Sequence, residues 1–253
     1  MYFDTHAHYE NKQFNNDRDE LLDLMLENDV SLILNAGSNL KSSKFSLKLA
    51  DRYEFIYASV GVHPHDSKDM TDDMIIELKQ LLTHPKAMAV GEIGLDFHYD
   101  FSPRDIQKKR FWEQLELARK VKKPVVIHMR EATEETLDII SEYKDLTGVF
   151  HCFPGSWETA KTILDTGWYI SFTGVVTFKN ARKAIEVIEK MPMDRLLLET
   201  DCPYMSPEPF RGRRNCSINI KYIAAKIAEI REISLEEVAD ITKENGKRLF
   251  QIM

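Results

Sequence analysis

Short apolar runs alternate with longer amphipathic segments along the whole chain. The runs are rich in Val, Ile, Leu and Ala, whereas the segments between them carry apolar residues at helical spacing. This alternation is typical of strand–helix units built around a parallel sheet. Eight strands are predicted, at Tyr2–Asp4, Ser31–Asn35, Ile56–Val60, Ala87–Gly91, Pro124–Ile127, Gly148–Phe150, Trp168–Ser171 and Arg195–Leu198. Most are too uniformly apolar to have a solvated face, so we expect both faces of the sheet to be covered.

Seven amphipathic segments lie between the predicted strands, and two more follow the last strand. They are Asp17–Glu27, Lys41–Arg52, Thr71–Thr83, Pro103–Lys120, Glu131–Tyr143, Ser156–Asp165, Asn180–Lys190, Ser217–Arg231 and Leu235–Phe250. Ser102 is predicted to cap the helix that begins at Pro103, and Ser234 with Glu237 has the pattern of a capping box. Eight such units in 253 residues predict a (β/α)8 TIM-type barrel with an additional C-terminal helix.

An open, doubly wound sheet is the alternative architecture for the same alternation of elements. We favour the barrel because polar residues follow six different predicted strands, which suits a ring of loops that converge at one end. No linker rich in Gly, Ser or Pro interrupts the chain, and no long internal repeat is visible. Residues 1–253 are therefore predicted to form a single barrel domain.

Composition excludes several classes of protein. The chain is 43% hydrophobic with only 10 Gly and 9 Pro, which excludes disordered and collagen-like proteins. No uncharged stretch is long enough to span a bilayer, and the N-terminus lacks the basic and apolar regions of a signal peptide. The three cysteines, Cys152, Cys202 and Cys216, show no paired spacing. We therefore expect a cytoplasmic protein with no membrane partner.

The charge balance is acidic, with 41 Asp and Glu against 34 Lys and Arg, a formal net charge of −7. This argues against a protein that coats nucleic acid by bulk electrostatics. It does not exclude an enzyme that acts on nucleic acid, because bound cations can hold phosphate locally. No pattern in the chain indicates an obligate protein partner.

Six residues with metal-binding side chains follow predicted strands. They are His6, His8, Glu92, His128, His151 and Asp201. Residues two apart in extended chain point to the same side, so His6 and His8 can present two imidazoles to one cation. Glu92 follows a buried apolar run, where a carboxylate is costly unless it is paired or binds a metal. Individually, each histidine could be a hydrogen-bonded structural group and Glu92 could form a salt bridge, but six such accidents at one end of the strands are improbable.

Six ligands exceed the three plus water of a mononuclear catalytic zinc site. We therefore predict two divalent cations per chain, with the two oxygens of Glu92 bridging them. Imidazole-rich coordination favours Zn, Mn, Fe or Co, whereas the two carboxylates leave Mg possible.

Weaker signals concern substrate binding. His63 follows the third predicted strand and could contact a substrate or fix its own loop. Arg211, Arg213 and Arg214 form a basic cluster beyond Asp201 that could bind a phosphate or could be a solvated charge run.

The sequence resembles the TatD family of metal-dependent deoxyribonucleases, within the amidohydrolase-like metallohydrolase barrels, from its first residues to its last helix. The matching stretches are Phe3–His8, Gly61–Pro64, Gly91–Asp96, Pro124–His128 and Leu196–Pro203. The resemblance implies one metal held by His6, His8, Glu92 and Asp201, and another held by Glu92, His128 and His151. It also implies that His63 contacts the substrate and that the enzyme acts as a 3′ to 5′ exonuclease.

Two places depart from the family pattern. After the second histidine, the family commonly has an aliphatic residue and Asp, where this chain has Tyr9 and Glu10. In the late loop, the usual Arg-Asn-Glu-Pro is replaced by Arg214-Asn215-Cys216-Ser217. Both changes leave the six predicted ligands intact.

Together these observations predict a metal-dependent phosphodiesterase, most simply a deoxyribonuclease acting on single-stranded DNA ends. A hydroxide formed between two metals is expected to attack phosphorus. In this prediction Glu92 bridges the metals, Asp201 accepts the proton, and His63 with Arg214 steadies the phosphate. The same ligands would also serve a carbonyl-attacking amidohydrolase, lactonase or D-aminoacyl-tRNA deacylase. A non-catalytic metal-binding or nucleic-acid-binding protein is the third alternative.

Overall fold

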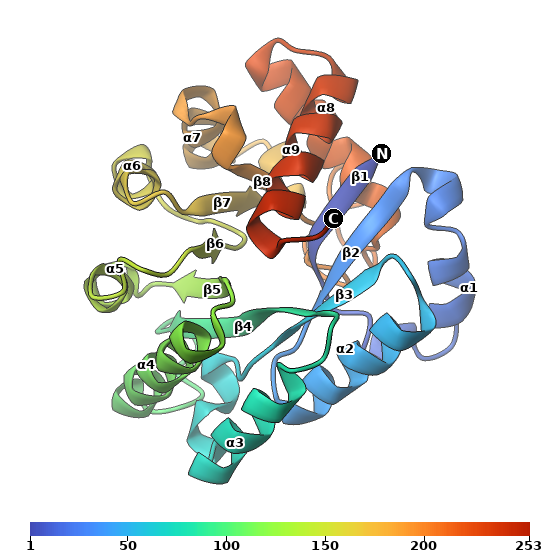
Figure 1. Cartoon of the computed structure of the whole chain (residues 1–253). Coiled ribbons are helices and arrows are strands. Elements are labelled where there is room, and N and C mark those ends of the chain that lie inside the picture. Colours follow the sequence, from blue (N-terminus) through green and yellow to red (C-terminus); the bar gives the residue numbers. More distant parts are fainter.

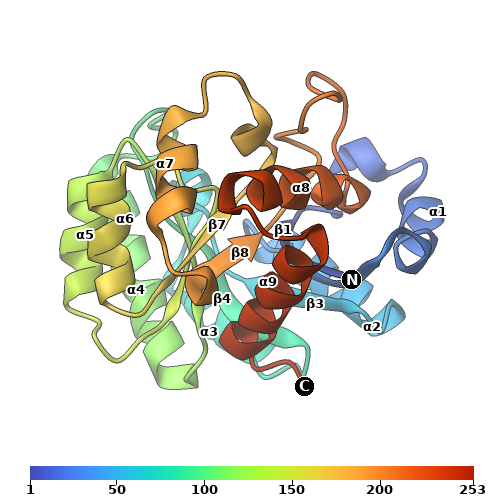
Figure 2. The same cartoon turned by 90° about the horizontal axis from the view of Figure 1, so that it is seen from above.

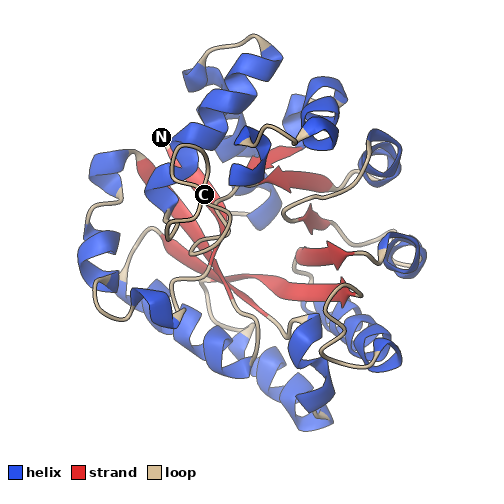
Figure 3. Cartoon of the chain, turned by 180° about the vertical axis from the view of Figure 1, so that it is seen from behind, coloured by secondary structure: helices blue, strands red, loops and turns tan.

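The computed structural model describes residues 1–253 as eight parallel strands surrounded by helices (Figure 1). The strands are β1 Tyr2–Ala7, β2 Val30–Ala36, β3 Ile56–Val60, β4 Ala87–Asp96, β5 Val125–Arg130, β6 Gly148–Phe150, β7 Tyr169–Phe172 and β8 Leu196–Leu198. Each strand pairs in parallel with the next along the chain, and the helices form an outer ring (Figure 3). The predicted (β/α)8 barrel is confirmed, and the open sheet is excluded.

The helices fall close to the predicted segments. They are α1 Arg18–Asp23, α2 Leu40–Arg52, α3 Asp72–Leu81, α4 Arg104–Val121, α5 Thr133–Ser141, α6 Trp157–Asp165, α7 Arg182–Lys190, α8 Ile220–Arg231 and α9 Leu235–Phe250. The prediction of one continuous helix over 17–27 is wrong, because α1 ends at Asp23 and a separate 3-10 turn follows at Leu26–Asn28. Asp29 then adopts a left-handed φ of 62°, which turns the chain into β2. No helix combines the length and apolarity needed to cross a bilayer.

The two predicted helix caps have different outcomes. The Ser234 hydroxyl accepts a hydrogen bond from the Glu237 backbone, and the Ser234 backbone donates one to the Glu237 carboxylate. The capping box of α9 is therefore confirmed. The prediction that Ser102 caps α4 is wrong, since Pro103 occupies the N-cap position and makes no side-chain cap. The Ser102 hydroxyl is used elsewhere: it donates to the carbonyl of His65 at 2.9 Å and accepts from the backbone of Lys68 at 3.0 Å.

The barrel closes through a short seam between its first and last strands. One isolated bridge, Ala7 to Cys202, joins them, and helix α9 packs against both β1 and β8 (Figure 2). Beside the bridge, the backbone of His8 donates to Cys202 at 2.8 Å and that of Asp201 donates to His6 at 2.9 Å. The seam therefore brings the residues that end β1 beside the loop that follows β8.

A layer of buried apolar side chains lies under the carboxyl ends of the strands. It includes Val126 on β5 and Val149 on β6. His128 lies two residues later on β5, and His151 follows the end of β6 directly, two residues after Val149, so both project from the same face as the apolar layer. The apolar interior of the barrel therefore lies directly beneath the polar side chains.

Candidate metal centre

Four donor atoms converge where β1, β4 and the loop after β8 meet. His6 Nε2 lies 3.1 Å from His8 Nε2 and 3.3 Å from Glu92 Oε2. His8 Nε2 lies 3.6 Å from the same Glu92 oxygen and 3.5 Å from Asp201 Oδ1. Asp201 Oδ1 is also 3.9 Å from His6 Nε2. The structure therefore brings together all four residues predicted for the first metal.

The second group of donors surrounds the other oxygen of Glu92. Oε1 lies 2.8 Å from His128 Nδ1, 2.8 Å from His151 Nε2 and 3.3 Å from His63 Nε2. His128 Nδ1 and His151 Nε2 are 3.2 Å apart. Each oxygen of Glu92 thus faces a different group of imidazoles, which is the arrangement of a bridging ligand. His63 was predicted to contact the substrate, yet its Nε2 lies as close to Glu92 Oε1 as the metal-binding donors lie to one another.

The donor set fits two divalent cations. Ligands at about 2.0–2.1 Å around a tetrahedral zinc ion lie roughly 3.3 Å from one another, and the separations within the two groups run from 2.8 to 3.9 Å. No lysine or arginine lies among these atoms to neutralise the two carboxylates. Imidazole and carboxylate donors of this kind suit Zn, Mn, Fe or Co.

The surrounding charges keep both acidic residues ionised. Burial would raise the pKa of Glu92, but the nearby imidazoles hold it well below its ordinary value. Burial opposes ionisation of Asp201 as well, yet the hydrogen bond from His8 and the charge of His6 lower its pKa. For His63, burial is the largest effect and lowers the pKa to about 4, so its imidazole is neutral near pH 7. Metal binding needs ionised carboxylates and neutral imidazoles, and the neighbouring carboxylates raise the pKa values of His8 and His151, so a bound cation would have to displace protons from these two rings.

Asp96, at the end of β4, orients the histidine of β5. It is fully buried and its Oδ2 lies 3.0 Å from His128 Nε2 and 2.9 Å from His65 Nε2. Burial would raise the pKa of Asp96, but the hydrogen bonds from both imidazoles lower it. With Nε2 of His128 held by this carboxylate, Nδ1 faces Glu92, an arrangement that typically fixes a metal-binding tautomer. Gly94 permits the close approach of the strands, since at its φ of 141° a Cβ would clash with the His128 carbonyl.

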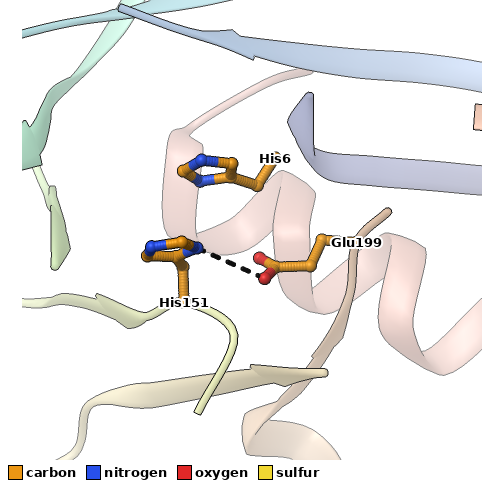
Figure 4. Close-up of side chains that lie close together, drawn as sticks. All are labelled: His6, His151 and Glu199. Carbon is orange, nitrogen blue, oxygen red and sulfur yellow. Dashed lines mark ion pairs between the residues drawn. The ribbon is translucent and has the colours of Figure 1, made fainter. Parts of the chain in front are cut away.

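Glu199 lies close to His6 and His151, one histidine from each donor group (Figure 4). It is fully buried and accepts hydrogen bonds from the Cys152 backbone and the Ser171 hydroxyl, each at 2.6 Å. Its Oε1 is 3.5 Å from His151 Nδ1, and the His151 ring stacks on that of His6 with centroids 4.1 Å apart. One carboxylate therefore stands beside a histidine from each group.

Asp96 and Glu199 were not among the site residues predicted from the sequence. The available signal was the one that identified Glu92, namely a carboxylate in or directly after an apolar strand.

Two departures from the family pattern contact each other. The Tyr9 hydroxyl lies 3.0 Å from the Ser217 hydroxyl and accepts a hydrogen bond from the Ser217 backbone at 3.0 Å. Ser217 in turn donates to the buried carboxylate of Asp4, which also accepts from Thr200. Burial raises the pKa of Asp4 to about 6, although these hydrogen bonds oppose the shift. This network fixes the chain on both sides of the seam, directly before His6 and Asp201. Glu10, which follows Tyr9 in the first of these departures, lies 3.2 Å from His8 Nδ1.

Arg214 is not brought to the donors. Its guanidinium pairs with Asp17 at 2.8 Å, donates to the Gln13 carbonyl at 2.7 Å and lies 4.8 Å from the Phe14 ring centroid. The guanidinium that does reach the site belongs to Arg130, at the end of β5, which was not predicted from the sequence.

A cavity of about 410 Å³ opens over the donors. Its walls include His63, Glu92, His128, Arg130 and Asp201. A second, mainly apolar cavity of about 270 Å³ adjoins it and shares the last three of these residues. A substrate can therefore reach the donors from an open polar side and extend into an apolar side.

A barrel with such a donor set at the carboxyl ends of its strands defines a metal-dependent hydrolase. Residues 3–251 match the model of the family described as TatD related DNase, and the chain belongs to the TatD family. It is 45% identical over 254 residues to the uncharacterized metal-dependent hydrolase YabD of Bacillus subtilis, covering 100% of both chains. It is 36% identical over 262 residues to the 3′-5′ ssDNA/RNA exonuclease TatD of Citrobacter koseri, covering 99% of each. The solved structure of YJJV, a TatD homologue from Escherichia coli K12, superposes with a TM-score of 0.94 at 30% identity, covering 100% of this chain and 98% of that one.

Proposed function

We propose that this hydrolase is a two-metal phosphodiesterase that releases nucleotides from the 3′ end of single-stranded DNA. The observation that carries the proposal is the division of Glu92 between two donor groups, one oxygen to each. The Citrobacter relative is named an exonuclease on single-stranded DNA and RNA, which supports the choice of substrate.

Two divalent cations held by these residues would acidify a water molecule and neutralise charge on a phosphoryl oxygen. Asp201 directs Oδ1 toward the first donor group and accepts the proton of the attacking water. His63 is neutral, so its imidazole can donate a hydrogen bond to a phosphate oxygen without neutralising Glu92. Arg130 supplies the fixed positive charge in the cavity wall.

The surroundings of the site favour a phosphate ester. Arg130 lines both cavities and has no carboxylate partner within ion-pair distance, so its charge is available to an anion. An acidic protein with one such guanidinium at the donors binds a phosphodiester locally rather than along a basic surface. A pocket at the mouth of the barrel suits a strand end better than the interior of a duplex.

The test is an assay of metal-loaded protein on end-labelled single-stranded DNA and, in parallel, on lactone and D-aminoacyl-tRNA esters. We expect stepwise release of nucleotides from the 3′ end, and loss of that release in Glu92→Gln. Hydrolysis of the esters alone would replace the phosphodiesterase with a carbonyl-attacking hydrolase. Binding of nucleic acid without turnover, unchanged in Asp201→Asn, would indicate a non-catalytic protein.

A further inference from the structure

Two half-exposed aromatic rings lie beside the metal centre, on the loop that follows β4. Tyr99 is 47% exposed and Phe101 is 55% exposed. Their rings stack with centroids 5.1 Å apart and planes 19° apart. Paired exposed aromatics form a patch rather than scattered apolar residues, and exposed apolar patches mark interaction sites.

The loop that carries these rings is firmly held. The Tyr99 backbone donates to Asp96 Oδ1 at 2.9 Å, and the Ser102 carbonyl accepts from Gln107 at 2.8 Å. The His65 ring packs edge-on against Phe101 with centroids 4.8 Å apart. Asp96 therefore anchors this loop with one oxygen and orients the metal-binding histidine of β5 with the other. The aromatic pair has a defined position relative to the metal centre.

A guanidinium joins the aromatic pair to the cavity. Arg130 lies with its guanidinium carbon 4.7 Å from the Tyr99 ring centroid. Arg130, Tyr99 and His65 all line the 410 Å³ cavity that contains Glu92. One continuous surface thus combines aromatic rings, an unpaired guanidinium and the metal-binding residues. Aromatic rings that stack on bases, together with positive groups that follow the backbone, are how proteins bind single-stranded nucleic acid.

We propose that the stacked pair of Tyr99 and Phe101 forms a platform whose exposed side receives a nucleobase that flanks the scissile phosphate of a single strand, while Arg130, over the Tyr99 ring, binds the backbone. The inference rests on the proposed nuclease function and deepens it, because it identifies the surface that selects a single strand. Bases in a duplex are stacked on their neighbours, whereas the bases of a single strand offer free faces to an aromatic ring. The platform therefore favours unpaired ends.

The test compares two single strands of equal length, one with ordinary bases and one with abasic sugars throughout. For the metal-loaded wild type and the variants Tyr99→Ala and Phe101→Ala, kcat/KM is measured on both. We expect the ratio of the normal to the abasic strand to fall roughly 10- to 100-fold in each variant, and to be largely retained in Tyr99→Phe. Fluorescence anisotropy in the presence of EDTA gives a second readout, in which the Kd for the normal strand rises by a similar factor.

Trp112→Ala is the matched control, because Trp112 is 48% exposed but lies on α4 outside the cavity. It should leave both the ratio and the Kd unchanged. An unchanged ratio in Tyr99→Ala and Phe101→Ala, or an equal fall in Trp112→Ala, would overturn the platform while leaving the nuclease intact. Failure of the wild type to cleave either strand would overturn the nuclease function and the platform with it.

Discussion

Glu92→Gln tests the central feature of the site, because one side chain serves both donor groups. Oε2 lies 3.3 Å from His6 Nε2, and Oε1 lies 2.8 Å from both His128 Nδ1 and His151 Nε2. The amide of Gln has no negative charge and only one oxygen, so one group loses its oxygen donor and the other keeps only a neutral one. Loss of a residue that merely orients a ligand typically weakens metal binding 10- to 100-fold, so loss of this ligand should cost at least about 100-fold at each site.

The expected occupancies follow from that factor. At a free metal concentration ten times the wild-type Kd, about 91% of wild-type sites are filled, whereas a 100-fold weaker variant fills about 9%. Each bound ion then stabilises the folded wild type by about 1.4 kcal/mol, a contribution that nearly vanishes in the variant. Elemental analysis after dialysis at fixed free metal measures the occupancy, and thermal unfolding with and without metal measures the stabilisation.

Glu131→Gln provides the control, since Glu131 is an exposed carboxylate that follows β5 and pairs with His98. It should bind two metals with wild-type affinity and keep the metal-dependent gain in Tm. Retention of both metals by Glu92→Gln, with affinity close to that of the wild type, would refute the bridging role. Loss of only one metal would show that Glu92 belongs to a single site.

Three further variants separate the roles of neighbouring residues. His63→Ala should lower kcat about 100-fold with two metals still bound, because three donors remain in the second group; loss of one metal by elemental analysis would make His63 a ligand. Asp96→Asn should weaken metal binding at the His128 site about 10- to 100-fold in a chelator competition, and unchanged affinity would show that His128 needs no orienting carboxylate. Arg214→Ala should leave kcat/KM on single-stranded DNA unchanged. Because the ion pair of Arg214 with Asp17 is about a third exposed, the variant should lower the free energy of unfolding in urea by at most about 1 kcal/mol. A raised KM would show that Arg214 contacts the phosphate.

The barrel and the gathering of the ligands at one of its ends could be predicted because both depend on local patterns, whereas the division of the ligands between two metals came from the family resemblance. Apolar runs mark the strands, and a polar residue that directly follows such a run lies at the carboxyl end of the sheet. His128 and His151 follow Ile127 and Phe150 in this way, and a parallel barrel brings all such positions to one end. The two-residue spacing of His6 and His8 also predicted that their side chains point in the same direction.

The rest of the site depends on contacts between residues far apart in the chain. Arg214 seemed available for a phosphate because its partner, Asp17, lies 197 residues earlier. Arg130 looked unremarkable in sequence, and only the packing of the loop after β4 shows that Tyr99 lies beneath its guanidinium. Whether a charged group is free or paired is a property of the folded surface, so local spacing cannot reveal it.

The short seam between β1 and the loop after β8 gives the proposed ions a role in stabilising the fold. Only Ala7 and Cys202 link the two ends of the sheet by a bridge, yet His6 and His8 on one side and Asp201 on the other belong to one donor group. A cation held there would cross-link β1 to the loop after β8 and so stabilise the closure of the barrel. It would join the beginning of the chain to a segment almost two hundred residues later. Chelation should then speed amide hydrogen exchange at this junction before it does so around the rest of the wall.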